Sequence, residues 1–315
     1  MGAYLVRRFG LMVLTLFGIS IIIFMLLRLT PGNIADILFD AGGFVDPADK
    51  ARIEADLGLD KPIPVQYAKW MGGLLSGDLG ISYQTERPAI QEIAPRIPIT
   101  ARLAGIALAF AVLLGVPFGV ISAVKQNTKL DYILRVISLS GLSMPAFWLG
   151  LLILMGFVAY FGTIPIYSDA PTGFWNALLM YSVPAAAVGF RSSALMMRLT
   201  RSSLLEVLRE DYIRTAWAKG QAGRIVIWRH ALKNAILPVA TVIGIEFAFL
   251  IGGLVVTETV FNLPGVARFL VQAILWRDYP VVQNLVMFIA IVVVTINFIV
   301  DMLYAALDPR IKYGD

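Results

Sequence analysis

Few residues of this chain have the chemistry for catalysis or metal binding. The sequence contains one histidine, His230, and no cysteine, so we expect no histidine- or thiolate-based metal centre and no disulfide. It contains no GxxxxGKS/T string and therefore no phosphate-binding loop for a nucleotide. An intramembrane enzyme needs a nucleophile with a base, or a set of metal ligands, and these observations argue against that class.

One acidic residue is notable for its apolar surroundings. Glu246 lies in the otherwise uncharged run from Ala235 to Thr257. A charge at the centre of a membrane helix costs at least ~2.5–3.5 kcal/mol, so such residues face protein or water. Two roles are open for Glu246. It either lines a pathway and meets a substrate amino group, or it forms a buried pair or hydrogen bond with a neighbouring span, for example with Arg102 or Arg191.

A second candidate pathway element is the string SMPAFW at residues 143–148. Pro145 removes a backbone donor and predicts a kink that exposes backbone, while Met144 and Phe147 carry side chains that adapt to varied cargo. Ordinary helix packing explains the same residues equally well.

The stretch from Arg198 to Pro238 is long and charge-dense, and it reads RLTRSSLLEVLREDYIRTAWAKGQAGRIVIWRHALKNAILP. The residues from Ser203 to Glu206 fit a capping box, which predicts that a helix begins there and ends at Gly220. A second helical stretch is expected at residues 225–235. Steps of four residues along the first helix predict one shared face, which carries Leu204, Leu208, Tyr212 and Ala216.

So much organised sequence between membrane spans indicates a docking surface rather than a simple turn. The small residues Ala216, Ala218 and Gly220 allow another surface to approach closely, and nearby charged side chains supply polar contacts. The alternative is a solvated amphipathic loop that lies on anionic lipid, which the basic residues of the stretch would favour.

The elements that position these residues are membrane helices. Apolar residues make up 58% of the chain and charged residues 15%, far from the averages of soluble proteins. Uncharged runs close to the ~20 residues that cross a bilayer predict an all-α integral membrane protein with six helical spans. The runs are 9–27, 103–124, 136–168, 170–190, 281–300 and, with Glu246 inside it, 235–257.

Lys and Arg cluster near both termini, at 125–135 and at 198–233, so the positive-inside rule places these segments and both termini in the cytoplasm. Residues 1–29 then form the N-terminus and first span, residues 30–97 an extracytoplasmic segment, and residues 98–315 a core of five spans with the cytoplasmic segment 198–235. In residues 30–97 we expect a short helix that Asp46 caps, with Pro47 at its first position and Gly58 at its end. The net charge of +5 follows from this topology, so no nucleic-acid partner is expected.

Several strings in the same order resemble a known family. EDYIRTAWAKG followed by RHALKNAILPV is similar to the cytoplasmic signature of the membrane subunits of binding-protein-dependent ABC importers, in the dipeptide and oligopeptide permease variant of the peptide/nickel group. LTPGN, LGLDKPIPVQYAKWMGGLLSGDLGIS, TETVFNLPGVARFLVQAILWRDYPVVQ and VDMLYAALDPRIKYGD also resemble this group. Residues 214–216 read Arg-Thr-Ala where the general signature has Glu-Ala-Ala, which agrees with the peptide-permease variant.

The resemblance implies a type I ABC importer permease in a prokaryotic cytoplasmic (inner) membrane, forming half of a translocation pathway. It implies a coupling helix at residues 210–220 that docks in a groove of a cytosolic ATPase. The docking residues would be Glu210, Asp211, Tyr212, Arg214, Thr215, Ala216, Lys219 and Gly220.

The implied partners are a second homologous permease subunit, two cytosolic ATPase subunits that use ATP and Mg, an extracytoplasmic substrate-binding protein and membrane lipid. The chain itself would bind no cofactor. Short peptides are the expected cargo, with nickel chelates or glutathione as alternatives within the group. An ion-coupled secondary transporter is the rival from another class, but it needs titratable groups that converge in the membrane, and only Glu246 is central here.

Overall fold

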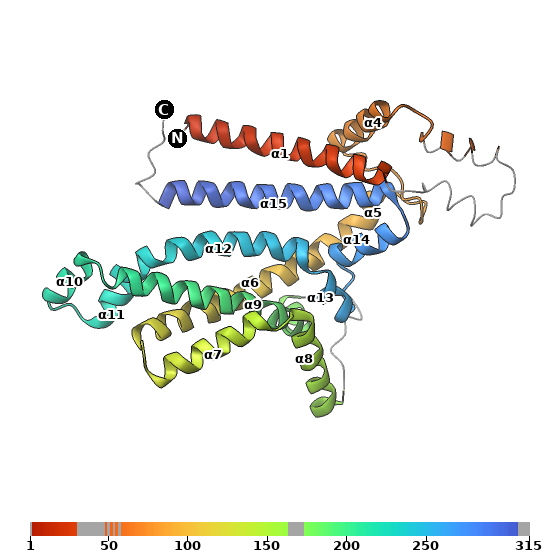
Figure 1. The fold of residues 1–315 in the computed structure, drawn as a ribbon. Coiled ribbons are helices and arrows are strands. Elements are labelled where there is room, and N and C mark those ends of the chain that lie inside the picture. Colours follow the sequence, from red (N-terminus) through yellow and green to blue (C-terminus); the bar gives the residue numbers. More distant parts are fainter. Residues whose placement is uncertain are drawn as a thin grey trace. The chain divides into compact units, whose positions relative to one another are not determined.

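The computed structural model describes residues 2–29, 48, 51–52, 54–55, 58–162 and 173–307 of the chain. The described residues are helical apart from turns and one isolated bridge between Ile81 and Pro88 (Figure 1). The chain divides into two compact units. One comprises residues 1–99 and 264–295, and the other comprises residues 100–263 and 296–315.

The first unit is built around the first part of the chain's last long helix. It contains α1 (Gly2–Leu29), α4 (Ile63–Ser76), α5 (Ala89–Ile93), the 3-10 turn Ala94–Arg96, α14 (Val266–Leu275) and the first part of α15 (Tyr279–Leu307). Helices α5, α14 and α15 share a core in which Ile93, Phe269 and Leu285 are buried. Burial of these apolar side chains holds the short helices in place.

Polar contacts fix the remaining parts of this unit. Asp278, 1% exposed, accepts hydrogen bonds from the Ser82 hydroxyl and from the Tyr83 backbone N–H, the latter at 3.2 Å. At the end of α1, Arg28 Nε donates to Gln66 Oε1 of α4 at 2.8 Å. Gln66 is therefore tied to α1, and Ser82 and Tyr83 to the turn between α14 and α15.

The predicted helix end at Gly58 is confirmed. Gly58 has φ +68°, and the next backbone N–H, of Leu59, donates to the carbonyl of Glu54 at 2.8 Å, which is the pattern of a left-handed C-terminal cap. The predicted start of this helix, at Asp46 and Pro47, lies outside the described residues.

The second unit is organised around α9. It contains α6 (Ile97–Val124), whose residues from 100 belong here, α7 (Lys129–Ser143), α8 (Ala146–Phe161), α9 (Phe174–Val207), α10 (Asp211–Ala218), α11 (Gly223–Ile225), the π-helical segment Val226–Ala231, α12 (Leu232–Gly253) and α13 (Val255–Val260). Helix α9 packs against α7, α8 and α12. Its contact with α6 depends on glycine.

The GxxxG pair of α6 packs directly against the α9 backbone. A Cβ atom on Gly115 would lie 2.6 Å from the carbonyl oxygen of Ser193 and 2.8 Å from Cβ of Met196. A Cβ atom on Gly119 would lie 2.7 Å from the carbonyl oxygen of Met197. The two helices pack closely at these glycines, because no larger residue fits there without displacing α9.

The predicted third span is not a single helix. Helices α7 and α8 meet at Met144 and Pro145 and are bent by 105° relative to each other (Figure 1). Met144 ends α7 with extended backbone angles, because the residue that precedes a proline is driven out of the α conformation, and Pro145 stands at the N-cap of α8. By contrast, Pro117, Pro184 and Pro238 lie inside continuous helices.

Four helical stretches of the described chain are long and apolar enough to cross a membrane, and a fifth is the bent α7–α8 pair taken as one span. The four are Tyr4–Leu29, Ala89–Val124, Gly223–Gly253 and Tyr279–Leu303. Helix α9, expected as the fourth span, is not in this set, because its serines and Arg191 lower the mean hydropathy of the helix.

The predicted helix start at Ser203 is wrong. Helix α9 runs without interruption through residues 203–206 and ends at Val207, so the backbone N–H groups that a capping box would satisfy are already bonded within a helix. The short helix of the charge-dense stretch begins instead at Asp211. Leu204 and Tyr212 consequently belong to different helices.

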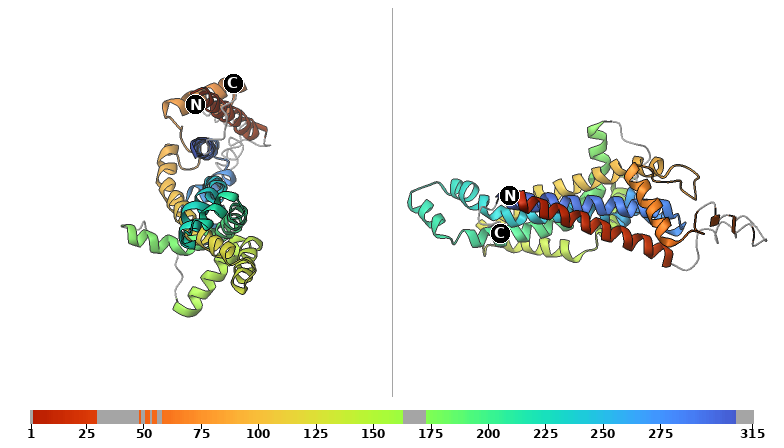
Figure 2. Two further views of the ribbon diagram at one scale, coloured as in Figure 1. Left: turned by 90° about the vertical axis from the view of Figure 1, so that its left-hand side faces the viewer. Right: turned by 90° about the horizontal axis from the view of Figure 1, so that it is seen from above.

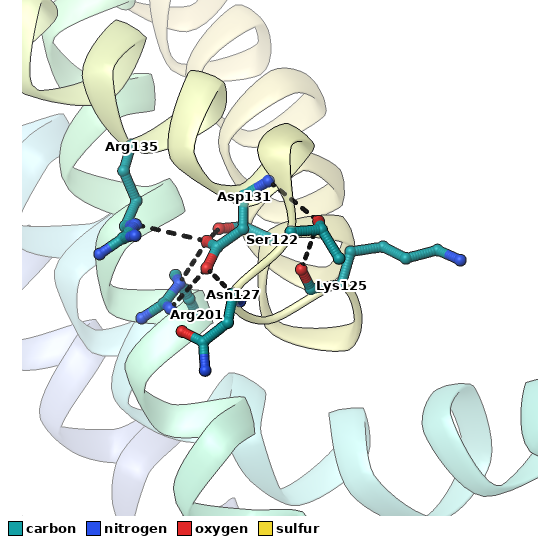
Figure 3. A network of polar contacts seen from close by, with 7 residues as sticks. Ser122, Lys125, Asn127, Asp131, Arg135 and Arg201 are labelled. Atoms are coloured by element: carbon teal, nitrogen blue, oxygen red, sulfur yellow. Dashed lines mark hydrogen bonds and ion pairs between the residues drawn. The ribbon is translucent and has the colours of Figure 1, made fainter.

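A buried carboxylate joins α6, α7 and α9 at one end of this unit (Figure 3). Asp131 of α7 is fully buried and accepts two parallel hydrogen bonds from Arg201 of α9, Nε to Oδ1 at 2.9 Å and Nη2 to Oδ2 at 3.0 Å. Ser122 of α6 donates to Oδ1 at 2.5 Å, and the Asn127 backbone N–H donates to Oδ2 at 3.0 Å. We call these four residues the Asp131 clamp.

Replacing Gly115 by alanine is expected to destabilise the protein by about 1–3 kcal/mol, because the new methyl group overlaps the α9 backbone. Gly105→Ala, on the same helix with no atom within 4 Å of its Cβ position, is the matched control and should not lower stability. Thermal unfolding in detergent measures both variants. Equal midpoints would contradict the packing described here.

Arg201→Gln is expected to cost about 3–5 kcal/mol, because it leaves the buried Asp131 carboxylate without its cation. Arg135→Gln removes the same charge from a side chain that is 42% exposed and lies 3.6 Å from the same carboxylate, and it should cost at most about 1 kcal/mol. Unfolding midpoints of the two variants would be compared. If both variants lose the same stability, Arg201 is not the main cation that stabilises the buried Asp131 carboxylate.

Candidate functional site

The charge-dense stretch from Arg198 to Pro238 contains a short two-faced helix, α10, at one end of the α9–α12 pair (Figures 1 and 2). Of its eight residues only Ile213 and Ala216 are buried, at 0% and 7% exposed. The helix ends as predicted at Gly220, which has φ +73°. The Gly220 N–H donates to the Trp217 carbonyl at 2.9 Å and the Gln221 N–H to the Ala216 carbonyl at 3.4 Å, a Schellman motif.

The buried face of α10 rests on a core formed by four other elements, which we call the seat. Its residues are Val120 and Ala123 of α6, Leu204 of α9, Val226 and Ala231 of the π-helical segment, and Ala235 of α12. Ser122, a member of the Asp131 clamp, lies between Val120 and Ala123 in the sequence. The seat and the clamp therefore hold the same ends of α6 and α9.

The outer face of α10 is polar and aromatic. Trp217 is 48% exposed and Tyr212 is 42% exposed, and Asn234 Nδ2 donates to the Tyr212 hydroxyl at 2.8 Å. Arg214 Nη1 lies 3.2 Å from Asp211 Oδ1, an exposed pair that contributes little to stability. The remaining predicted docking residues on the exposed side are Glu210, Thr215, Lys219 and Gly220.

Two features of this surface differ from the sequence-based expectation. Ala216 does not offer low relief to a partner, because its side chain points into the seat. Trp217 was missed, although its position next to Ala216 in the AWAKG string turns it by about 100° around the helix, away from the buried side. Trp217 is held over Gly223, where a Cβ atom would lie 3.0 Å from the indole ring.

The second helical stretch is present but begins at Gly223 and contains the unforeseen π-helical segment Val226–Ala231. His230, the single histidine, belongs to this segment. Short π-helical insertions are frequent at functional sites. Within the described part of the chain, no group of three or more acidic or histidine residues is placed to hold a metal ion.

Glu246 is buried in the structure, at 8% exposed. Its Oε2 accepts a hydrogen bond from the Ser192 hydroxyl of α9 at 2.6 Å. Of the two roles left open by the sequence, the contact with a neighbouring helix is the one that the structure shows. The partner is a serine rather than Arg102 or Arg191, because the helix packing of α9 against α12 turns Ser192 toward α12.

The other pathway candidates lie at the α7–α8 break. Pro145 and Phe147 are exposed, the latter at 44%, and Met144 is half-buried. These residues lie where α7 meets α8, whereas Glu246 lies on α12. Helix α9 packs against all three of these helices.

The chain matches two family models. The model described as binding-protein-dependent transport system inner membrane component matches residues 115–313, and the model of the N-terminal part of such membrane components matches residues 1–104. The chain is 41% identical to the dipeptide transport system permease protein DppB of Alkalihalophilus pseudofirmus, over 99% of this chain and 100% of the relative. It is 41% identical to the glutathione transport system permease protein GsiC of Pectobacterium atrosepticum, over 98% of this chain and 99% of the relative.

Solved structures show a similar fold at lower identity. The MetNI methionine ABC transporter in an inward-facing conformation matches with a TM-score of 0.59 and 19% identity, over 70% of this chain and 98% of the matched chain. An amino acid ABC transporter crystallised with histidines matches with a TM-score of 0.54 and 14% identity, over 69% and 94%. From its family models and its relatives, the chain belongs to the inner-membrane permease components of binding-protein-dependent transport systems.

Proposed function

We propose that this chain is one of two permease subunits of an ATP-driven importer for short peptides. The observation that carries the proposal is α10, a helix whose apolar side is seated in the membrane domain and whose polar and aromatic side is free. An exposed tryptophan ringed by polar residues is typical of a protein-binding surface. Relatives of this chain are named as dipeptide, di/tripeptide and glutathione permeases, which supports peptides as the cargo.

In this proposal residues 30–97 are extracytoplasmic, residues 98–315 form the permease core, and residues 198–235 are the cytoplasmic coupling segment. Six spans with both termini in the cytoplasm place α10 on the same side as ATP. The other components are a second permease subunit, two ATPase subunits that bind ATP and Mg, and an extracytoplasmic binding protein that delivers the peptide.

Force on α10 would reach the spans through two contacts. Ile213 and Ala216 press on the seat, which includes the ends of α6 and α9. The Asp131 clamp links those ends to α7, which leads into the break at Met144 and Pro145. Packed helices move as rigid bodies between discrete arrangements, so a displacement of α10 would change the angle between α7 and α8.

Trp217→Ala is expected to weaken ATPase docking at least about tenfold, because exposed tryptophans dominate such interfaces. Trp175→Ala, which changes a tryptophan that is 72% exposed near the start of α9, is the matched control. The amount of ATPase that co-purifies with the detergent-solubilised permease measures docking. Equal recovery from both variants would count against α10 as the docking surface, and uptake that survives ATP depletion would refute the importer itself.

Gly220→Val is expected to uncouple uptake from ATP hydrolysis. A β-branched residue at φ +73° costs about 1–3 kcal/mol of backbone strain, although no atom lies within 4 Å of the Cβ position. Gly220→Asn is the control, since asparagine tolerates the left-handed conformation. Peptide uptake per ATP hydrolysed in proteoliposomes should fall for valine and stay near wild type for asparagine. Normal uptake per ATP hydrolysed by the valine variant would show that the backbone conformation at the end of α10 is not needed for coupling.

A further inference from the structure

The central helix of the second unit is enclosed on nearly all sides. Helix α9 packs against α7, α8 and α12, and its contact with α6 runs through Gly115 and Gly119. Between residues 181 and 200, every side chain is buried or half-buried except two. The two exposed side chains are Arg191 and Arg198. They are two helical turns apart on one face, separated by about 10 Å along the axis.

Arg191 lies beside the apolar part of α12, within the stretch Gly223–Gly253 that is long and apolar enough to cross a membrane. Its neighbour Ser192 hydrogen-bonds Glu246 of α12, so Arg191 and Glu246 are at the same level. About 20 Å of helix separates Glu246 from Lys233, the last basic residue before the apolar part of α12. An arginine side chain is too short to reach the cytoplasmic surface from that depth. Snorkelling of Arg191 to that surface is therefore excluded in this geometry.

Neither arginine is neutralised within the described part of the chain. Arg191 lies 5.6 Å from the ring centroid of Phe249, a contact with an aromatic face rather than a carboxylate. The nearby acid, Glu246, accepts a hydrogen bond from Ser192, and among the described residues no ion pair joins it to Arg191. Phe249 and Ile245 of α12 are themselves 57% and 52% exposed, so the arginine and these apolar residues border the same open face.

A guanidinium at this depth must face water or an anion. Contact with lipid costs at least ~2.5–3.5 kcal/mol, and charged residues within membrane spans face the interior of the bundle or a water-filled cavity. The charge on this face is positive. Its complement is a carboxylate, which arginine binds through two parallel hydrogen bonds.

We propose that Arg191 and Arg198 form a cationic stripe along the translocation pathway, and that Arg191 binds the terminal carboxylate of the peptide in transit. This inference rests on the proposed function. Every unmodified peptide carries that carboxylate whatever its side chains, so one fixed cation recognises peptides without regard to sequence. Arg198, about 10 Å nearer the cytoplasm, receives the carboxylate next. Exposure to water keeps each contact weak enough for release.

The chain has no cysteine, which allows a direct test in the assembled complex. Arg191→Cys and Arg198→Cys are treated with membrane-impermeant methanethiosulfonates that attach either a trimethylammonium or a sulfonate group. Leu113→Cys, in the middle of α6 and 71% exposed, is the lipid-facing control, and the wild-type complex corrects for cysteines of other subunits. We expect both arginine positions to react and position 113 to remain unmodified, because a thiol reacts as its thiolate in water.

Charge at position 191 should then decide uptake. Arg191→Cys is expected to reduce uptake about tenfold at limiting peptide concentration. Uptake should recover when the trimethylammonium group is attached to the cysteine, and it should stay low when the sulfonate group is attached. Arg191→Lys should retain most of the uptake. No labelling at position 191, or the same uptake after both reagents, would overturn the proposal. Loss of the second permease subunit from Arg191→Cys but not from Arg191→Lys would also overturn it, and would assign the arginine to that subunit.

The carboxylate is tested separately in inside-out vesicles without binding protein. Alanyl-alanine at millimolar concentration should slow labelling of Arg198→Cys, in which Arg191 is retained, and its C-terminal amide should not. Equal effects of the two peptides, or no effect of either, would contradict carboxylate binding. Uptake by the wild type without ATP would refute the importer, whereas the labelling pattern tests the stripe whether or not the chain serves an importer.

Discussion

The close packing of α6 against α9 is the constraint on which the second unit depends. It is possible only because Gly115 and Gly119 have no side chains where the α9 backbone passes. That approach brings Ser122 within reach of the clamp that Arg201 closes on Asp131. It also leaves the arginine stripe as the one exposed part of the middle of α9. A packing contact between two apolar helices thus determines where the polar groups of the membrane domain meet.

The permease combines an exposed binding surface, the free side of α10, with a packed set of helices that holds α10 in place. Helix α10 has too few residues to be stable alone, and it is ordered by burying Ile213 and Ala216 in the seat. Because the seat is made from four other elements, a partner that binds the free side of α10 acts on α6, α9 and α12 together. In the proposed importer the chain contributes geometry, and the energy comes from ATP that the separate ATPase subunits hydrolyse.

Local signals in the sequence predicted what depends on local structure. Gly220 and Gly58 end helices because only glycine adopts their backbone angles freely. The helix start predicted from Ser203 and Glu206 was wrong, since the residues of a capping box also occur inside a continuous helix, where Ser203 is half-buried and Glu206 is exposed. The partner of Glu246, the burial of Ala216 and the Asp131 clamp depend on how distant helices rotate against one another, which no single-sequence pattern specifies.

Docking of an ATPase on the free side of α10 can be tested by photo-cross-linking in the assembled complex. A photoreactive amino acid would replace Thr215, which is exposed on α10, and in a control it would replace the exposed Leu113 of α6. We predict a covalent adduct with the ATPase from position 215 and none from position 113. An ATPase adduct from position 113, or its absence from position 215 in a complex that still hydrolyses ATP and imports peptide, would contradict this docking.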